Sequence, residues 1–390
     1  MLLSLLAAST YCKVKAECHP FDPTCSPLMA LVEFDVCRLP YWQVTDPLYA
    51  GEVQRELKRV ANRGSIGAPS TSQFGSGLPA VNDWSGGVLV PGGKIYGIPA
   101  TETRVLVIDT NQNTLNPNAI TGLAAGAYKW IGGVLAPNGK IYGIPAANLG
   151  QGFLIIDPAT DTATTTGNID GYNGGVLAPN GKIYAIPSDL AGKQFAVLDP
   201  ETNSVQTFGP SFTTRFVGGV LGLNGKIYAI PGFGDGQPVA VVDPTSNTVT
   251  NIGAGVASEG WFSAALAPDG KIYGNNLGAN AQLQIDPYAS TVNRIGPTGA
   301  ANDFEGSVLA SNGKIYGTTR SAAQFTELDP ATLVQTRFGA SGGPYSGGIL
   351  APNGKIYGIP RQATTGIIID PASRENLCPA ILMSGYLNKL

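Results

Sequence analysis

Two carboxylates, Glu259 and Glu305, lie in neighbouring copies of a repeated sequence unit and are the candidates for acid and base chemistry. Glycosidases use such a pair when the fold holds the two carboxyl groups at a defined separation. The sequence contains one histidine, His19, so a site built from several histidines is excluded. It also contains no nucleophile elbow, phosphate loop, dinucleotide fingerprint or zinc-protease motif. Because the sequence does not define the distance between Glu259 and Glu305, it favours binding over catalysis.

An aromatic residue stands ten positions before each of seven repeated lysines, and its type suggests ligand stacking. The seven positions are Trp84, Trp130, Tyr172, Phe216, Trp261, Phe304 and Tyr345. Exposed aromatic faces stack on sugar rings or fill the pockets of a partner protein. Variable polar residues flank them, namely Asp83, Lys129, Asp170, Arg215, Glu259, Asp303 and Glu305. The alternative is that each ring packs between neighbouring repeats, and this interpretation is favoured because a ligand rarely needs sevenfold symmetry.

The repeated lysines define the unit that must position these residues. Each lysine lies within Gly-Lys-Ile-Tyr, and successive lysines are 41 to 46 residues apart. The seven lysines are Lys94, Lys140, Lys182, Lys226, Lys271, Lys314 and Lys355. Each unit reads as two β-hairpins, one turning at an Asn-Gly pair such as Asn180-Gly181 and one at an Asp-Pro-x-Thr sequence. Four short strands per unit, without helical periodicity, predict an all-β, seven-bladed β-propeller of four-stranded antiparallel blades.

Paired glycines indicate which strand lies innermost. Five units carry Gly-Gly in the strand before the first turn, as at Gly174-Gly175, and a strand near the axis is crowded by its symmetry mates. The aromatic positions should then surround one mouth of the channel, where the variable loops between second and third strands also emerge. The last unit lacks a fourth strand after Asp370, whereas residues 71–75 have the character of that strand. We expect residues 71–75 to complete the last blade and close the ring.

Two other regularities are expected to be structural. The seven lysines should form a solvated rim, with a basic ring for acidic glycans as the less favoured alternative. Seven aspartates begin the second turns and should cap them, with calcium binding less favoured. These aspartates are Asp109, Asp157, Asp199, Asp243, Asp286, Asp329 and Asp370.

Composition and flanking segments divide the 390-residue chain into four parts. The 24 basic and 27 acidic residues give a net charge of -3 and a charged fraction of 13%, which argues against a nucleic-acid binder. Residues 1–11 resemble the apolar region of a secretory signal and are too short to span a bilayer. Residues 12–70 should form a cap with helix-like segments at 28–39 and 51–61, residues 71–370 the propeller, and residues 371–390 a docking tail.

All five cysteines lie outside the repeats. Cys12 is a candidate for lipid attachment, the alternative being a disulfide bond. With Cys12 consumed by lipid, Cys18, Cys25, Cys37 and Cys378 would form two bridges in an oxidising compartment, with three connectivities open. The spacing of Cys18 and Cys25 matches no common zinc motif, so no metal is expected. The cysteines therefore predict a small disulfide-tied N-terminal helical cap.

The repeats Gly-Gly-Val-Leu-Ala-Pro-Asn-Gly-Lys-Ile-Tyr-Gly-Ile-Pro and Ile-Ile-Asp-Pro-x-Thr, behind a short cysteine-containing leader, resemble the exported β-propeller repeat lipoproteins of leptospiral spirochaetes. This resemblance implies an exported protein that is periplasmic or lipid-anchored at the outer membrane through Cys12. Tyr11 departs from the usual lipid-attachment motif, which has a small residue before the cysteine. A more distant similarity is to the seven-bladed virginiamycin B lyases. Those enzymes use histidine, and residues 71–370 contain none, so the similarity does not imply their activity.

Together these patterns predict a non-enzymatic binding or scaffold module of the bacterial cell envelope. A protein or glycan would be engaged at the aromatic mouth and its variable loops. We expect a monomer without cofactor, metal or nucleic acid, and with membrane contact only through a lipid anchor. The alternative is a lyase or glycosidase that uses carboxylates at the same mouth.

Overall fold

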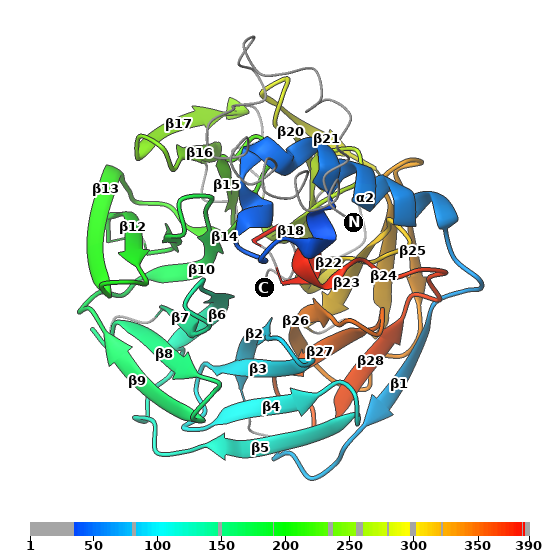
Figure 1. Ribbon diagram of the computed structural model, residues 1–390, viewed down its shortest axis with the longest axis horizontal. Coiled ribbons are helices and arrows are strands. Elements are labelled where there is room, and N and C mark those ends of the chain that lie inside the picture. Colours follow the sequence, from blue (N-terminus) through cyan, green and yellow to red (C-terminus); the bar gives the residue numbers. More distant parts are fainter. Residues whose placement is uncertain are drawn as a thin grey trace, which may run out of the picture.

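Antiparallel strands form seven four-stranded blades around a common centre, as Figure 1 shows. The computed structural model describes residues 35–79, 83–146, 150–189, 191–232, 237–254, 260–278, 281–296, 302–320, 323–383 and 385–386. This arrangement confirms the predicted all-β, seven-bladed propeller.

The first four blades repeat the same up-and-down meander. The first contains β2 (Trp84–Leu89), β3 (Lys94–Pro99), β4 (Val105–Asp109) and β5 (Thr114–Ile120). The second contains β6 (Trp130–Leu135), β7 (Ile141–Pro145), β8 (Phe153–Asp157) and β9 (Thr162–Thr166). The third contains β10 (Tyr172–Leu177), β11 (Ile183–Pro187), β12 (Lys193–Asp199) and β13 (Ser204–Phe212). The fourth contains β14 (Phe216–Leu221), β15 (Ile227–Pro231), β16 (Val239–Asp243) and β17 (Thr248–Ile252).

The last three blades add one pairing between blades and one strand from outside the repeats. The fifth contains β18 (Trp261–Leu266), β19 (Ile272–Gly278), β20 (Gln282–Asp286) and β21 (Thr291–Ile295). The sixth contains β22 (Asn302–Leu309), β23 (Ile315–Thr319), β24 (Phe325–Asp329) and β25 (Val334–Phe338). Strands β19 and β22 also pair with each other, which joins the fifth and sixth blades into one sheet. The seventh contains β26 (Tyr345–Leu350), β27 (Ile356–Pro360), β28 (Gly366–Asp370) and β1 (Ser70–Phe74).

Strand β1 closes the ring as expected from residues 71–75. It pairs antiparallel with β28, so that Ser70 lies opposite Asp370 and Phe74 opposite Gly366. The ring of Phe74 meets that of Tyr357 edge-on, with centroids 5.6 Å apart. Phe208 makes the same contact with its blade's tyrosine at 5.7 Å, so β1 supplies the side chain that a fourth strand supplies elsewhere. Closure leaves the seventh blade without an unpaired outer edge at β28.

The two paired glycines of the innermost strand are required for two separate reasons. Gly174 has a φ of 67° and lies at a shift in register between β10 and β11, a bulge that favours glycine. At Gly175, an added Cβ would lie 2.5 Å from Cδ1 of Ile144 on the preceding blade. The second glycine thus receives the isoleucine of the neighbouring blade's Ile-Pro sequence. The predicted crowding is confirmed, and its source is the adjacent blade.

Replacing Gly175 by alanine is expected to lower the free energy of unfolding by about 1–3 kcal/mol, because the added methyl group overpacks this contact with Ile144. The measurement is the midpoint of urea unfolding at unchanged slope. Gly51 provides a matched control, since it lies in helix α2 (Ala50–Arg63) and a Cβ there would have no atom within 4 Å. Gly51→Ala should leave the midpoint unchanged or raise it. An unchanged midpoint for Gly175→Ala would contradict the packing argument.

In five blades, the Asn-Gly turn and the repeated tyrosine join the blade to the next one. Asn180 Nδ2 donates to the hydroxyl of Tyr184 at 3.0 Å and to the carbonyl of Pro244 at 3.1 Å. The same tyrosine hydroxyl lies 2.8 Å from Oδ1 of Asn247 in the turn of the following blade. Equivalent pairs are Asn138 with Tyr142, Asn224 with Tyr228, Asn312 with Tyr316, and Asn353 with Tyr357. The last pair reaches Thr110 of the first blade and so fastens the ring a second time.

Helix α2 confirms the helix expected at residues 51–61. Its buried residues, Val53, Leu57 and Val60, recur at helical spacing and form one apolar face. The other helices outside the propeller are short. The 3-10 helices η2 (Val36–Arg38), η3 (Gln43–Thr45) and η4 (Pro47–Tyr49) precede α2, and α3 (Pro379–Leu382) follows the propeller. Of the helix-like segment expected at residues 28–39, residues 28–34 lie outside the described residues. We call residues 35–66 and 371–386 together the cap.

The cap covers the face that carries the Asn-Gly turns. In Figure 1, α2 lies in front of the fifth and sixth blades, where Gln54 packs beside Gly270 and Ala61 against Gly313. The hydroxyl of Tyr41 donates to the carbonyl of Ala136 in the second blade's turn. Within the cap, the C-terminal segment contacts the N-terminal segment, for example through a 3.2 Å hydrogen bond from the hydroxyl of Tyr386 to the backbone carbonyl of Thr45. Among the described residues, the cap therefore covers one end of the propeller, and no element covers the other.

Candidate functional site

The predicted aromatic ring lies inside the blades. Six of its side chains are described and are buried, namely Trp84, Trp130, Tyr172, Phe216, Trp261 and Tyr345. The indole N–H groups of the three tryptophans donate to backbone carbonyls of their own blades at 2.8–2.9 Å. The side chain of Phe304 lies outside the described residues. This burial leaves the six rings no exposed face for ligand stacking and supports the packing interpretation.

The residue one position after each aromatic residue lies on the other side of its strand, and five of these seven residues line a pocket at the mouth. Side chains alternate between the two faces of a strand, so the residue after each buried ring points the other way. These positions are Ser85, Ile131, Asn173, Val217, Phe262, Glu305 and Ser346. Five of them, Ser85, Ile131, Asn173, Phe262 and Glu305, line a cavity of about 180 Å³, which we call the mouth pocket. Tyr128, Arg320 and Arg361 complete its lining.

A second cavity is lined by paired glycines and small residues of the innermost strands. Its lining includes Gly132, Gly174, Gly219 and Ser263, and its volume is about 20 Å³. That is room for about one water molecule.

A buried ion-pair cluster occupies one side of the mouth pocket. Nη1 of Arg361 donates to both carboxylate oxygens of Glu305, at 2.7 and 2.6 Å. Nε of Arg361 lies 3.7 Å from a carboxylate oxygen of Asp83. The side chains of Arg361, Glu305 and Asp83 are 12%, 16% and 9% exposed. One guanidinium group thus holds two largely buried carboxylates from neighbouring blades.

Burial dominates the electrostatics of this cluster. It raises the pKa of Glu305 above its ordinary value, although Arg361 and Arg320 oppose the shift. Burial also raises the pKa of Asp83, again against the attraction of the two arginines. Lys129 lies close by, with its ammonium group 2.8 Å from the carbonyl of Glu102, and burial lowers its pKa. Removal of either arginine would therefore strengthen proton binding by the two carboxylates.

The two arginines differ in their partners. The guanidinium group of Arg320 stacks over the ring of Phe262, with its carbon 5.5 Å from the ring centre. Among the described residues, Arg320 forms neither a hydrogen bond nor an ion pair. Across the pocket, the amide oxygen of Asn173 is buried without a hydrogen-bond partner. Tyr128 is 49% exposed and has a φ of 52°, which is uncommon for a residue other than glycine.

Sequence reasoning identified only part of this pocket. Asp83, Lys129 and Glu305 were expected near the mouth and are found there. Asp170 instead pairs with Lys193 at 2.8 Å. Glu259 and the side chain of Asp303 lie outside the described residues, and nothing brings Arg215 into the pocket lining.

Arg320 and Arg361 were missed, although the sequence contains a signal for them. Both stand six residues after a repeated lysine, where four other repeats carry the small residues Ala100, Ala146, Ser188 and Gly232. A large charged residue at a position that is otherwise small departs from the repeat. Such a departure marks a side chain that packing alone does not require.

The charged regularities of the turn-bearing face are structural, as expected. All seven aspartates accept a hydrogen bond from the backbone N–H two residues later and so cap their turns. Five repeated lysines pair with the aspartate of their own blade, and Lys314 pairs with Glu327. These partly exposed pairs add little stability. They leave few unpaired charges for a basic ring.

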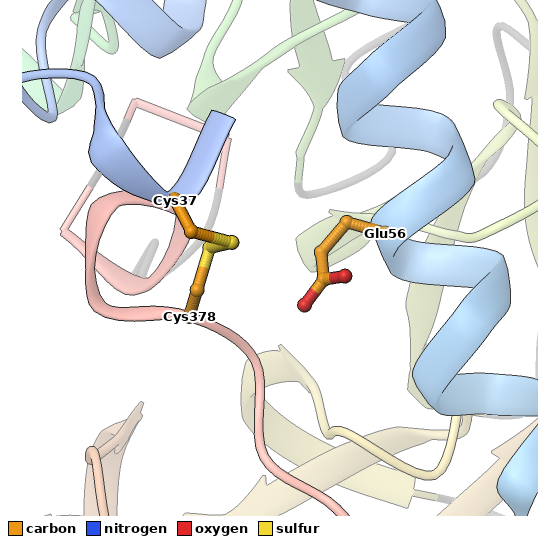
Figure 2. A group of neighbouring side chains, drawn as sticks. All are labelled: Cys37, Glu56 and Cys378. Carbon is orange, nitrogen blue, oxygen red and sulfur yellow. A yellow bond between two sulfur atoms is a disulfide. The ribbon is translucent and has the colours of Figure 1, made fainter. Parts of the chain in front are cut away.

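The one disulfide bond among the described residues joins Cys37 to Cys378 and so ties the N-terminal and C-terminal segments of the cap to each other. Cys12, Cys18 and Cys25 lie outside the described residues. Figure 2 shows the carboxylate of Glu56 pointing toward this disulfide, with ligand atoms of the three residues within 4.8 Å of one another. The two sulfur atoms bond to each other, and Arg59 donates to both oxygens of Glu56 at 2.6 and 2.9 Å. With the two cysteines oxidised, these residues therefore form a covalent cross-link and an ion pair.

The protein is a seven-bladed β-propeller whose turn-bearing face is covered by the cap and whose opposite face carries the mouth pocket. No family model and no curated protein matches the sequence. Among solved structures, a streptogramin B lyase is 11% identical with a TM-score of 0.65, covering 77% of this chain and 97% of that chain. An inactive virginiamycin B lyase variant from Staphylococcus aureus, solved with quinupristin, is 11% identical with a TM-score of 0.65, covering 77% of this chain and 99% of its own.

A third similar structure is the extracellular domain of a hybrid two-component system from B. thetaiotaomicron. It is 12% identical with a TM-score of 0.59, and the match covers 76% of this chain and 41% of that chain. At these identities the similarity shows the fold alone. The expected distant similarity to virginiamycin B lyase-type propellers is confirmed, whereas the resemblance to leptospiral lipoproteins stays a prediction. No helix among the described residues is long and apolar enough to cross a membrane.

Proposed function

We propose that this protein is a non-enzymatic binding module of the bacterial cell envelope that takes its ligand or partner at the mouth pocket. The observation that carries the proposal is the asymmetry of the two faces. The cap covers the turn-bearing face, whereas the opposite face presents a cavity of about 180 Å³ with charged and aromatic walls. Concave sites with a few convergent polar groups are where proteins bind small molecules.

Export is part of this proposal. It is supported by the Cys37–Cys378 disulfide, since such bonds persist in oxidising compartments. A similar propeller is an extracellular domain, which agrees with export. Lipid attachment at Cys12, an outer-membrane or periplasmic place and a monomeric state belong to the same proposal. The intact mass of the non-reduced protein recovered from the envelope tests signal cleavage and lipid attachment together.

Catalysis by carboxylates is less well supported. Both oxygens of Glu305 accept hydrogen bonds from Arg361, so the carboxylate is engaged as an ion-pair partner. A glycosidase needs a second carboxyl group at a defined separation, and Asp83 is held by the same guanidinium group. The lyases of similar fold do not extend their activity to this chain, because their similarity shows the fold alone.

A retention experiment tests the proposed function. The purified full-length protein is dialysed against fractionated envelope glycans and peptides, and retained and released molecules are analysed by mass spectrometry. We expect retention without chemical change, lost in Asn173→Phe, which fills the mouth pocket. Lys94→Ala, an exposed change on the capped face, should leave retention unchanged. Product formation that disappears in Glu305→Gln would favour the enzyme alternative instead.

A further inference from the structure

Arg320 is a cation of the mouth pocket that forms no ion pair with any described residue. Arg361 at the equivalent position of the next blade already holds Glu305 and Asp83. Arg320, in contrast, contacts the flat face of Phe262 and forms no ion pair among the described residues. A guanidinium group that stacks through its face keeps its N–H edge available, and that edge matches a carboxylate.

The opposite wall of the pocket contains a hydrogen-bond acceptor that can pair with a donor on the ligand. The amide oxygen of Asn173 is a buried acceptor without a partner among the described residues. Burial of an acceptor without a donor costs free energy, which a ligand hydroxyl or ammonium group would recover once the Asn173 side chain turns its oxygen into the cavity. Asn173 and Arg320 lie on the third and sixth blades and line the same cavity. A ligand that satisfies both must therefore carry an anionic end and a donor end.

The charge and the volume of the pocket further restrict the class of ligand. Among the residues that line the pocket, Arg320 and Arg361 are positively charged and Glu305 is negatively charged, which leaves one excess positive charge. A ligand with a single negative charge would balance it, whereas a phosphate dianion would exceed it. The cavity of about 180 Å³ is smaller than the ~300–1,000 Å³ of sites for drug-sized ligands. One sugar ring or one amino acid is the appropriate scale.

We propose that the mouth pocket binds a small carboxylate-bearing molecule, with Arg320 holding the carboxylate and Asn173 accepting a hydrogen bond from the ligand's hydroxyl or ammonium group. The inference rests on the proposed function, since it names the ligand class of the same pocket. A sugar acid and an amino acid share this chemistry, and the experiment separates them.

Isothermal titration of the full-length protein uses two pairs of probes. D-glucuronate is compared with D-glucose, which lacks the carboxylate, and L-alanine with L-alaninamide. We expect one carboxylate probe to bind and its neutral partner to bind about 10- to 100-fold more weakly, as for loss of charged hydrogen bonds. Which carboxylate binds identifies the source of the ligand.

Variants then assign the carboxylate to Arg320. Arg320→Met should weaken the carboxylate probe about 10- to 100-fold without changing the neutral probe, and Arg320→Lys should recover part of the loss because it restores the charge without the planar edge. Arg55→Met, an exposed change in the cap, is the matched control. Circular dichroism verifies that each variant is folded.

The outcomes separate this inference from the proposed function. Carboxylate binding that survives in Arg320→Met, or absence of binding by both carboxylates at millimolar concentration, overturns the inference. A neutral molecule that is retained by the wild type and lost in Asn173→Phe also overturns it, but leaves the mouth pocket as the binding site. Loss of all retention, including that of envelope fractions, overturns both.

Discussion

Replacing Arg361 by methionine is expected to lower the free energy of unfolding by about 3–5 kcal/mol at neutral pH, because removing one member of a buried ion pair leaves its partners uncompensated. Arg361 is 12% exposed and holds Glu305 and Asp83 from the two adjoining blades. Arg320 remains in the pocket of the variant, but it forms no hydrogen bond with either carboxylate. Urea unfolding of the wild type and the variant, analysed at equal slope, measures the difference.

The loss in Arg361→Met should depend on pH in a defined direction. Burial already raises the pKa of Glu305 above its ordinary value, and removing Arg361 raises it further. A carboxyl group that binds its proton more tightly in the folded state destabilises the fold as the pH rises through the range between its unfolded and folded pKa values. We therefore expect the difference between variant and wild type to shrink on acidification toward the ordinary pKa of about 4.3.

Two controls separate the buried pair from a general effect of removing arginine. Arg55→Met breaks an exposed pair with Glu52 on α2, and such pairs contribute at most about 1 kcal/mol. The double variant Arg361→Met with Glu305→Gln removes one of the stranded charges and should regain part of the loss. A loss for Arg361→Met that is equal at acidic and neutral pH would contradict the electrostatic explanation.

The repeat predicts most of the fold because each of its regular residues has a local structural role. The Asn-Gly pair forms the first turn and also binds the tyrosine two residues after the lysine, as Asn180 does with Tyr184. The aspartate of each second turn caps it, as Asp157 does. Closure by residues 71–75 was predictable because Phe74 occupies the position of Phe208 in a complete blade. Regular patterns of this kind encode packing and turns.

The candidate site was less predictable because sevenfold regularity points to packing. The aromatic residue is present in every repeat since it fills the blade interior, as buried Trp84 does. The next residue faces the mouth and varies from Ser85 to Glu305, so its alternation along the strand was the better guide. Arg320 and Arg361 depart from a position that is small elsewhere. Which of the two arginines forms an ion pair depends on distances between blades, and no sequence pattern encodes those distances.

Removing the disulfide by the paired replacement Cys37→Ser and Cys378→Ser is expected to lower the free energy of unfolding by about 2–5 kcal/mol. The bond joins residues separated by 341 positions, so it restricts nearly the whole unfolded chain. The measurement is the urea midpoint of the variant and of the wild type, both without reductant. Treatment of the wild type with dithiothreitol should move its midpoint to that of the variant.

The same variant should leave the mouth pocket intact. The disulfide lies in the cap, whereas the ring is closed independently by the pairing of β1 with β28. The contact of Asn353 with Thr110 provides a further closure that does not involve sulfur. We therefore expect lower stability together with unchanged affinity for the carboxylate probe. Equal loss of affinity and stability would mean that the cap supports the shape of the opposite face. If dithiothreitol leaves the urea midpoint of the wild type unchanged, the disulfide contributes little to stability.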